Sequence, residues 1–463
     1  QKLKEFRKVP EMDFAIHEVA ASIDSLLDYV RLREGNFKMY EDEQAFFLDF
    51  IDFTLLTDGT SSDAEFRYIE EIGKRDSMTF ALKTEGINPS QLLSFEKDSL
   101  PGLADAWLSG NYRGTIVLPF DQEGTKLIHR ADLMVDDFFY IAEDTISAGM
   151  FKYQTENISY EGETKKAVLA TLDARNDFFF KDLKSPFFQS DSLGLQVDIT
   201  NGIVGITPHF YDRFAKGETG TIKLFPYEEP PRVELDYAIG NLPLEDFLET
   251  FNSEELLKGT VDIKLDLDAN GLDLESITSS LAGTIYVVGD SLMLQGLNLD
   301  EVIRDFQRSQ SFNLVDIGAV VLTGPAGIVY SKGSSYVSLL TADKNDSTQI
   351  SKFSSKWSLD TGKIKADDVA FATLKNRVAA QGWLDMKTDS LDFSIGILND
   401  KGCAIYNQRI FGSAGEPEYS KVKFLKTLLA PVTNVVKGAL GVKCDVFYDG
   451  IVTHPEKPEK ERK

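Results

Sequence analysis

Alternation of apolar and polar residues is the feature that most limits how this chain can fold. From Thr260 to Asp268 the odd positions are apolar and the even positions are polar or charged. Successive side chains of a β-strand point to opposite faces, so this pattern predicts a strand with one apolar and one polar face. The same rhythm, less strict, recurs at Thr115–Leu118, Ser192–Ile199, Thr284–Val288, Phe353–Leu359, Val378–Leu384 and Leu391–Ile397.

Turn residues separate these segments, and helical patterns are few. Asn201-Gly202 and Asp360-Thr361-Gly362 supply the positive φ angles that tight hairpins need. Short helices are predicted at Pro89–Leu93, Leu242–Leu248 and Leu299–Phe306, and a longer one at 421–440. Glu11–Tyr29 fits either a helical stripe or strands. The sequence therefore predicts a mainly β, antiparallel fold with a few short helices.

Two segments suggest an internal repeat. Residues 88–118 and 241–267 share the order short helix, loop, glycine and amphipathic strand. Such units fit an elongated stack in which each unit buries its apolar face against its neighbours. We expect an N-terminal β-rich repeat region over residues 1–230, a C-terminal β region over 231–450 that includes the helix 421–440, and a disordered tail over 455–463.

The charge of the chain excludes several classes of function. The 463 residues carry a net charge of −25, which argues against nucleic-acid binding and against a polybasic grip on anionic lipid head groups. Hydrophobic residues make up 42%, including 32 Phe, which excludes a disordered chain. No run of 18 apolar residues is present, so we expect any membrane anchor to lie outside this chain, which opens at Gln1.

Metal and cofactor sites are not predicted. The chain has only two cysteines and four histidines, and none has the close spacing of a zinc site. Cys403 and Cys444 are either two buried thiols or, in an oxidising compartment, one disulfide. The acidic pairs Asp136-Asp137 and Glu228-Glu229 have no catalytic partner nearby in sequence, and solvated surface is the preferred interpretation. No catalytic residue, cofactor-binding residue or metal ligand is therefore assigned.

An ordered run of motifs in residues 240–420 resembles the C-terminal region of the AsmA family. The run comprises Leu257–Leu265, Gly271–Ile277, Ser280–Leu292, Gly296–Leu299, Gln349–Gly362, Ala379–Met386 and Ile410–Pro417. Ser291 and Asn298 depart from the family pattern, which has Gly and Asp there. A looser likeness to the family's strand repeat covers Ile23–Phe53.

The resemblance implies a fold, a place and a function. AsmA-like proteins are curled β-sheets with an apolar groove, and an N-terminal helix usually anchors them to the inner membrane of diderm bacteria. We therefore expect a periplasmic protein, tethered to the inner membrane in its full-length form, that is not an enzyme. It would shield or conduct phospholipid acyl chains in its groove and contribute to outer-membrane lipid homeostasis. Its partners would be phospholipid and, in addition, other envelope proteins.

One face of the C-terminal strands is the predicted groove lining. The candidate lining residues are Val261, Ile263, Leu265, Ile285, Val287, Phe353, Trp357, Leu359, Leu384, Phe393 and Ile395. A shift of one residue in any strand would invert its assignment. Two alternatives stay open: an assembly or scaffold protein that binds envelope proteins through its β-edges, and a glycan hydrolase with a carboxylate pair. The helix 421–440 would cap the sheet or lie on a membrane.

Overall fold

The chain forms two compact β units, over residues 1–212 and 213–463. The structure is a computed structural model that describes residues 11–23, 27–57, 60–88, 106–119, 126–141, 145–159, 161, 170–186, 188–210, 218–250, 257–271, 273–296, 298–301, 303–304, 346–414, 417–424 and 445–455. These residues are mainly strand, with antiparallel pairing throughout and a few short helices, as the sequence predicts. The predicted division at 230/231 lies 18 residues beyond the observed division at 212/213.

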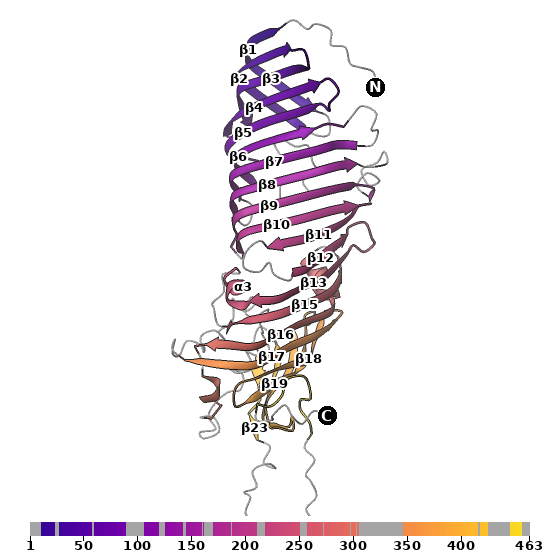
Figure 1. Cartoon of the computed structure of the whole chain (residues 1–463). Helices are drawn as coiled ribbons and strands as arrows, with labels where there is room; N and C mark the ends of the chain where they lie inside the picture. The colour runs from indigo at the N-terminus through magenta and orange to yellow at the C-terminus, as the bar shows by residue number, and fades with distance from the viewer. Residues whose placement is uncertain are drawn as a thin grey trace, which may run out of the picture. The chain divides into compact units, whose positions relative to one another are not determined.

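The N-terminal unit is a meander in which every strand pairs with the next strand in the chain (Figure 1). Its described strands are β1 (Met12–Ile23), β2 (Leu27–Glu41), β3 (Ala45–Thr57), β4 (Thr60–Glu71), β5 (Ser77–Ile87), β6 (Trp107–Val117), β7 (Lys126–Ile141), β8 (Thr145–Ser159), β9 (Asp173–Lys184), β10 (Gln189–Thr200) and β11 (Ile203–Phe210). The segment Glu11–Tyr29, which fitted helix or strand, is therefore strand wherever it is described.

Aligned irregularities bend the strands of this unit. Asp137 in β7 and Asp182 in β9 have positive φ angles of 55° and 54°, which a strand residue adopts only at a local kink. Between them in β8 lies Gly149, where a Cβ atom would be 3.0 Å from Asp182 Oδ2. Phe138 lies beyond the kink and Phe151 lies before it, and their ring centroids are 5.3 Å apart. The apolar side chains on the two sides of the kink therefore lie on the same face.

The bend builds a small core on that face. Ala148, Leu183 and Leu193 are buried together, and Phe138, Ile146, Phe180, Phe188 and Leu195 pack against them. These residues come from β7 to β10 and the loop between β9 and β10. Four successive strands and one loop therefore share one buried apolar cluster on this face.

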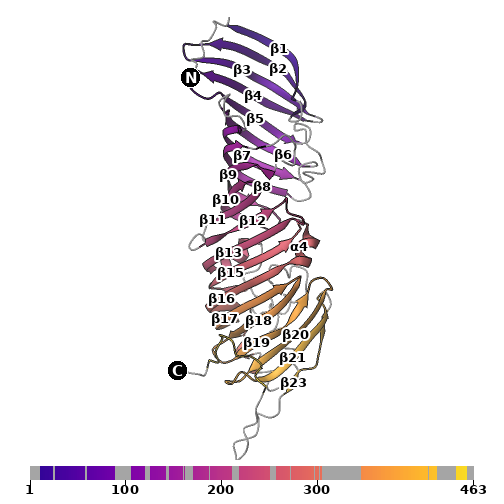
Figure 2. The same ribbon diagram turned by 90° about the vertical axis from the view of Figure 1, so that its right-hand side faces the viewer.

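The C-terminal unit is a second antiparallel meander (Figure 2). Its described strands are β12 (Glu218–Phe225), β13 (Arg232–Pro243), β14 (Leu257–Lys258), β15 (Thr260–Asn270), β16 (Ala282–Gln295), β17 (Ser347–Asp360), β18 (Lys363–Ala372), β19 (Arg377–Asp385), β20 (Ser390–Leu398), β21 (Ala404–Ser413), β22 (Pro417–Tyr419) and β23 (Lys423–Phe424). The strand segments predicted from alternation lie within observed strands, except that Leu118, the last residue of the segment Thr115–Leu118, follows the end of β6.

Short helices connect some of these strands. The helix predicted at Leu242–Leu248 corresponds to α3 (Leu244–Thr250), which begins two residues later because Leu242 and Pro243 end β13. In the helix predicted at Leu299–Phe306, the described residues 299–301 and 303–304 are helical. Leu244, Leu248 and Leu299 are each fully buried, so both turns are held by packing. The helix α4 (Leu274–Ser280) was not predicted. Its N-cap is Asp273, whose Oδ1 accepts the backbone N–H of Ser276 at 2.8 Å.

A segment that follows the last strands closes the C-terminal unit. Residues 445–455 pack Tyr448 and Val452 against Ala370, Ala372, Ala379, Leu398 and Ala404. Arg377, which is buried, donates from its guanidinium to the carbonyls of Val452 (3.1 Å) and Asn399 (2.8 Å). Burial lowers the pKa of Arg377. Cys403 is disulfide-bonded, which selects the disulfide over the two free thiols, and Cys444 is the only other cysteine of the chain.

Parts of several predictions fall outside the described residues. Lys423–Phe424 pair with β21 as strand β23, so the start of the predicted helix 421–440 is not helical; residues 425–440 lie outside the described residues. The whole of the predicted helix Pro89–Leu93 and residues 456–463 of the predicted tail also lie outside the described residues. No helix in the described parts of the chain is long and apolar enough to cross a membrane.

Candidate functional site

A single row of apolar residues crosses all eleven described strands of the N-terminal unit. Each residue of the row is the direct cross-strand partner of the next, so all side chains lie on one face. In strand order the row is Phe14, Phe37, Phe50, Phe66, Phe80, Gly114, Leu133, Tyr153, Phe178, Leu195 and Pro208. We call this set the apolar row.

The rings of the apolar row touch one another and remain open to solvent. Ring centroids are 5.0 Å apart for Phe14 and Phe37, 4.9 Å for Phe37 and Phe50, and 6.0 Å for Phe50 and Phe66. Phe14 is 46% exposed and Phe66 is 37% exposed. The row is thus a continuous aromatic surface in its first strands, and it is not sealed inside a core.

Gly114 keeps the row continuous at β6. A Cβ atom at this position would lie 2.5 Å from Cζ of Phe80, so the phenylalanine ring lies directly over the glycine backbone. Any larger residue would force the ring of Phe80 out of the row. The glycine therefore contributes space to the surface, and the aromatic ring of the neighbouring strand fills that space.

The opposite face carries a matching row of polar residues. Moving one residue along each strand from the apolar row gives a second set of direct partners, all of them polar. In strand order this polar row is Asp13, Lys38, Asp49, Arg67, Thr79, Thr115, Asp132, Gln154, Asp177, Gln196 and Thr207. The sheet of the N-terminal unit is therefore strictly two-faced along these rows.

Ion pairs and hydrogen bonds organise the polar row. The guanidinium of Arg67 donates to both carboxylate oxygens of Asp49, at 2.7 and 2.8 Å, and of the two side chains only that of Asp49 is buried. Gln154 donates its side-chain amide to Asp132 at 2.6 Å, and Arg130 donates to both oxygens of the same carboxylate. Hydrogen bonding by Arg130 lowers the pKa of Asp132. These charges are satisfied by one another, as expected of a stable, water-facing surface.

In the C-terminal unit, the strand register places all eleven predicted lining residues on one face. Ile263, for example, pairs with Val287, and Leu265 pairs with Ile285, which in turn pairs with Trp357. Further along, the register continues through β18 and β19 to β20 on the same face. The members differ in depth: Val261, Val287, Phe353, Leu359, Phe393 and Ile395 are buried, whereas Ile263, Leu265, Ile285, Trp357 and Leu384 are half-buried.

This face is concave where Trp357 and Phe393 meet. The two rings lie on β17 and β20, whose axes would be about 14 Å apart in a flat sheet. Their centroids are nevertheless 6.0 Å apart and the rings are edge-on. The residues beneath them are small: Trp357 pairs with Ala366, and Phe393 pairs with Gly382. At Gly382, with φ of 141°, a Cβ atom would lie 2.1 Å from the carbonyl oxygen of Asp392.

The sequence prediction missed the apolar row of the N-terminal unit. The available signal was the density of aromatic residues at alternate positions, such as Phe50 in Ala45–Thr57 and Phe178 and Phe180 in β9. Bends at residues such as Asp137 shift the alternation by one position. The pattern is therefore interrupted in the sequence even though the face is continuous in the structure.

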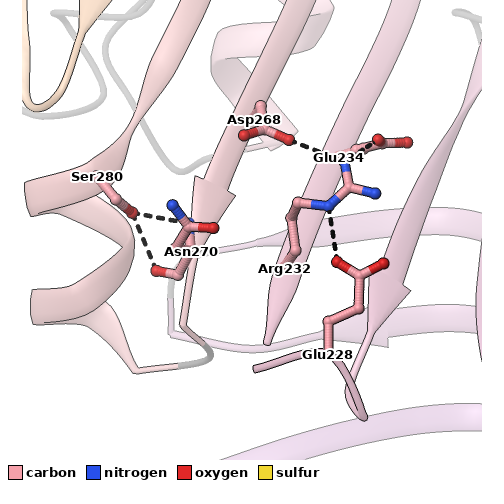
Figure 3. Close-up of polar contacts among 6 residues, drawn as sticks. All are labelled: Glu228, Arg232, Glu234, Asp268, Asn270 and Ser280. Atoms are coloured by element: carbon pink, nitrogen blue, oxygen red, sulfur yellow. Dashed lines mark hydrogen bonds and ion pairs between the residues drawn. The ribbon is translucent and has the colours of Figure 1, made fainter. Parts of the chain in front are cut away.

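One carboxylate of each acidic pair is bound to an arginine. Glu228 accepts a hydrogen bond from Arg232 at 3.0 Å, and Asp136 is in an ion pair with Arg113. Figure 3 shows that Arg232 also contacts Glu234 and Asp268. The hydrogen bond to Glu228, followed by those to Glu234 and Asp268, raises the pKa of the Arg232 guanidinium. Within the described residues, no group of three His, Cys, Asp or Glu side chains could hold a metal ion.

Comparison with known proteins assigns no family. No family model matches the sequence, and no curated protein matches it.

Proposed function

We propose that this protein is a non-catalytic, AsmA-like lipid-binding protein that shields the acyl chains of phospholipids on the apolar faces of its β units. The observation that carries the proposal is the apolar row of the N-terminal unit, with its solvent-exposed rings. Large exposed apolar patches on soluble proteins mark interaction sites, because burying them against water-free surfaces is favourable.

The dimensions of the apolar row suit an extended hydrocarbon chain. Eleven strands give ten intervals of about 4.8 Å, so the row is roughly 48 Å long. Each methylene group that leaves water for such a surface contributes about 0.8 kcal/mol. The polar row on the reverse face supplies the hydration that a protein with a lipid-loaded face needs. Binding would thus be a passive partition of acyl chains, without a chemical step.

The compartment we propose is the periplasm, with the full-length protein tethered to the inner membrane by a segment outside this chain. The disulfide at Cys403 supports an oxidising compartment, since cytosolic thiols are kept reduced. The motif resemblance in residues 240–420 supports the same location. In that setting the protein would conduct phospholipid and contribute to outer-membrane lipid homeostasis.

Native mass spectrometry with lipid extraction tests the proposal. We expect the purified, exported chain to carry several phospholipid molecules in the absence of detergent. Phe66→Asp places a carboxylate at the fourth of the eleven positions of the apolar row, where the side chain is already exposed, and should reduce bound lipid without loss of β circular dichroism. Thr79→Asp is the matched control, because it adds the same charge to the polar row beside Arg67.

Two outcomes would contradict the proposal. A wild-type chain without lipid would mean that the apolar faces bind something else. Equal lipid loss in Phe66→Asp and Thr79→Asp would mean that lipid binding does not depend on which face carries the charge. If a lipid-free chain captured envelope proteins, that result would support the alternative function of a scaffold that binds them through its β-edges.

A further inference from the structure

A cleft of about 650 Å³ lies on the polar face of the C-terminal unit, away from the apolar face. Its floor is formed by β18 and β19, and one wall is formed by Tyr448, Asp449 and Gly450 of the closing segment. That wall is fixed, because Gln381 donates a hydrogen bond to the carbonyl of Phe447 and Tyr448 donates one to Asp368. The size falls in the range of small-molecule sites in proteins.

The strand pairing is interrupted at the floor of this cleft. Lys365 pairs with Trp383 and Val369 pairs with Ala380, so three residues of β18 lie opposite two residues of β19. Asp367 is the extra residue, because the pairing of β18 with β17 also skips it. Bulges of this kind re-aim side chains and expose backbone groups, and they are frequent beside binding sites.

Two lysines with no carboxylate partner line the cleft. Lys363 and Lys365 are two residues apart on one strand and therefore point to the same face. The ammonium of Lys363 lies 4.2 Å from the ring centroid of Trp383, the direct partner of Lys365. This cation–π contact holds the ammonium of Lys363 over the residue that is paired with Lys365. Within the described part of the chain neither lysine forms an ion pair, although the chain carries a net charge of −25.

The cleft also holds three carboxylates, those of Asp360, Asp367 and Asp449, so a ligand meets both signs of charge there. Asp367 accepts the hydroxyl of Ser358 at 3.1 Å, and Asp360 accepts the hydroxyl of Thr361 at 2.7 Å. Asp449 lines the opposite wall. A ligand that satisfies both sides would place an anionic group at the lysines and a hydroxyl or amino group toward Asp449.

We propose that this cleft binds a small solute or head group through a phosphate or carboxylate held by Lys363 and Lys365. Gln381 and the backbone at the bulge would supply further hydrogen bonds. The site is independent of the acyl-chain binding proposed above, because its side chains point away from the apolar face. A variant that loses anion binding in the cleft should keep acyl-chain binding, and a variant that loses acyl-chain binding should keep anion binding.

Calorimetric titration with inorganic phosphate at low ionic strength tests the site. We expect saturable binding of one phosphate per chain. Lys365→Gln should weaken it at least about tenfold, because a charge-assisted hydrogen bond is removed. The control is Lys387→Gln, an exposed lysine that does not line the cleft. Circular dichroism should be the same for both variants.

A second titration separates the two sources of the anionic group. The probe is vesicles of phosphatidylglycerol and phosphatidylcholine, with phosphatidylcholine vesicles as the blank. Binding of free phosphate alone supports a solute site, whereas lysine-dependent binding of the anionic vesicles supports a lipid head group. The proposal is overturned if neither probe binds saturably, or if Lys365→Gln and Lys387→Gln bind phosphate equally well.

Discussion

Two separate variants, Val261→Asp and Ile263→Asp, test how deeply each side chain is buried on the apolar face of the C-terminal unit. The two residues lie on the same face of β15 and are two positions apart. Val261 is 1% exposed and pairs with Leu242, which is also 1% exposed, whereas Ile263 is half-buried. Val261 also lies close to β16, since a Cβ atom on Gly289 would be 2.9 Å from Val261 Cγ1.

The expected free-energy changes differ several-fold. Val261→Asp loses about 1.5–3 kcal/mol of burial free energy. It also leaves a carboxylate without a partner in an apolar site, which adds about 2 kcal/mol or more, even if the group becomes protonated. We therefore expect a local destabilisation of at least about 4 kcal/mol. Ile263→Asp loses roughly half of a side-chain burial term, about 1 kcal/mol, because its carboxylate reaches water.

Hydrogen exchange measured by mass spectrometry gives the local free energy of opening for each strand. We expect amide protection in β13, β15 and β16 to fall by about a thousand-fold in Val261→Asp and by less than about tenfold in Ile263→Asp, since 1.4 kcal/mol corresponds to a factor of ten. Lipid binding should be tested in Ile263→Asp, which keeps the fold. Equal loss of protection in the two variants would refute the burial difference on which the reasoning depends.

Three further perturbations have defined outcomes. Cys403→Ser should lower the stability of the C-terminal unit by about 4 kcal/mol, the loop-closure value for the 41 residues that separate Cys403 from Cys444. Thermal unfolding with and without reductant measures this, and an unchanged wild type in reductant would contradict it. Hydrogen bonding by Arg409 at 2.6 Å lowers the pKa of Asp392, so this pair stabilises the fold above about pH 4 and is lost as the pH falls further. Asp392→Asn should therefore melt below the wild type at pH 6 and converge with it near pH 2; parallel melting curves would argue against the pair. Gly382→Ala should reduce amide protection in β19 and β20, because its Cβ atom would lie 2.1 Å from a backbone oxygen, and unchanged protection would refute that clash.

The fold class and one face could be predicted from sequence because both depend on local alternation. In β15 the pattern Val261, Ile263, Leu265 is uninterrupted, and the same parity continues through paired strands. All eleven residues chosen from alternation consequently share a face. Their depth could not be predicted, because the burial of Val261 depends on residues such as Leu242 and Leu292 that are distant in sequence.

The apolar row and the polar cleft could not be predicted for a different reason. The row runs perpendicular to the strands, so consecutive members are 13 to 34 residues apart in the sequence. The spacing is irregular because the loops differ in length: Phe80 follows Phe66 by 14 residues, and Gly114 follows Phe80 by 34. Register, which fixes those partners, is set by turn geometry and by kinks such as that at Asp137. The cleft needs the bulge at Asp367 and the closing segment near Tyr448, and these two meet only in the folded chain.

The pairing of each N-terminal strand with the next strand in the chain has a consequence for how this unit assembles. Every strand pair of this unit joins consecutive strands, with partners at most 40 residues apart, so each loop to be closed is short relative to the chain and folding is fast for a β protein. A nascent N-terminal unit can therefore add one strand at a time as it leaves the ribosome. The C-terminal unit differs, because Ala370 and Ala379 stay uncovered until Tyr448 and Val452 have been synthesised. Its final packing is therefore the late step of maturation, and the step most exposed to chaperones and proteases.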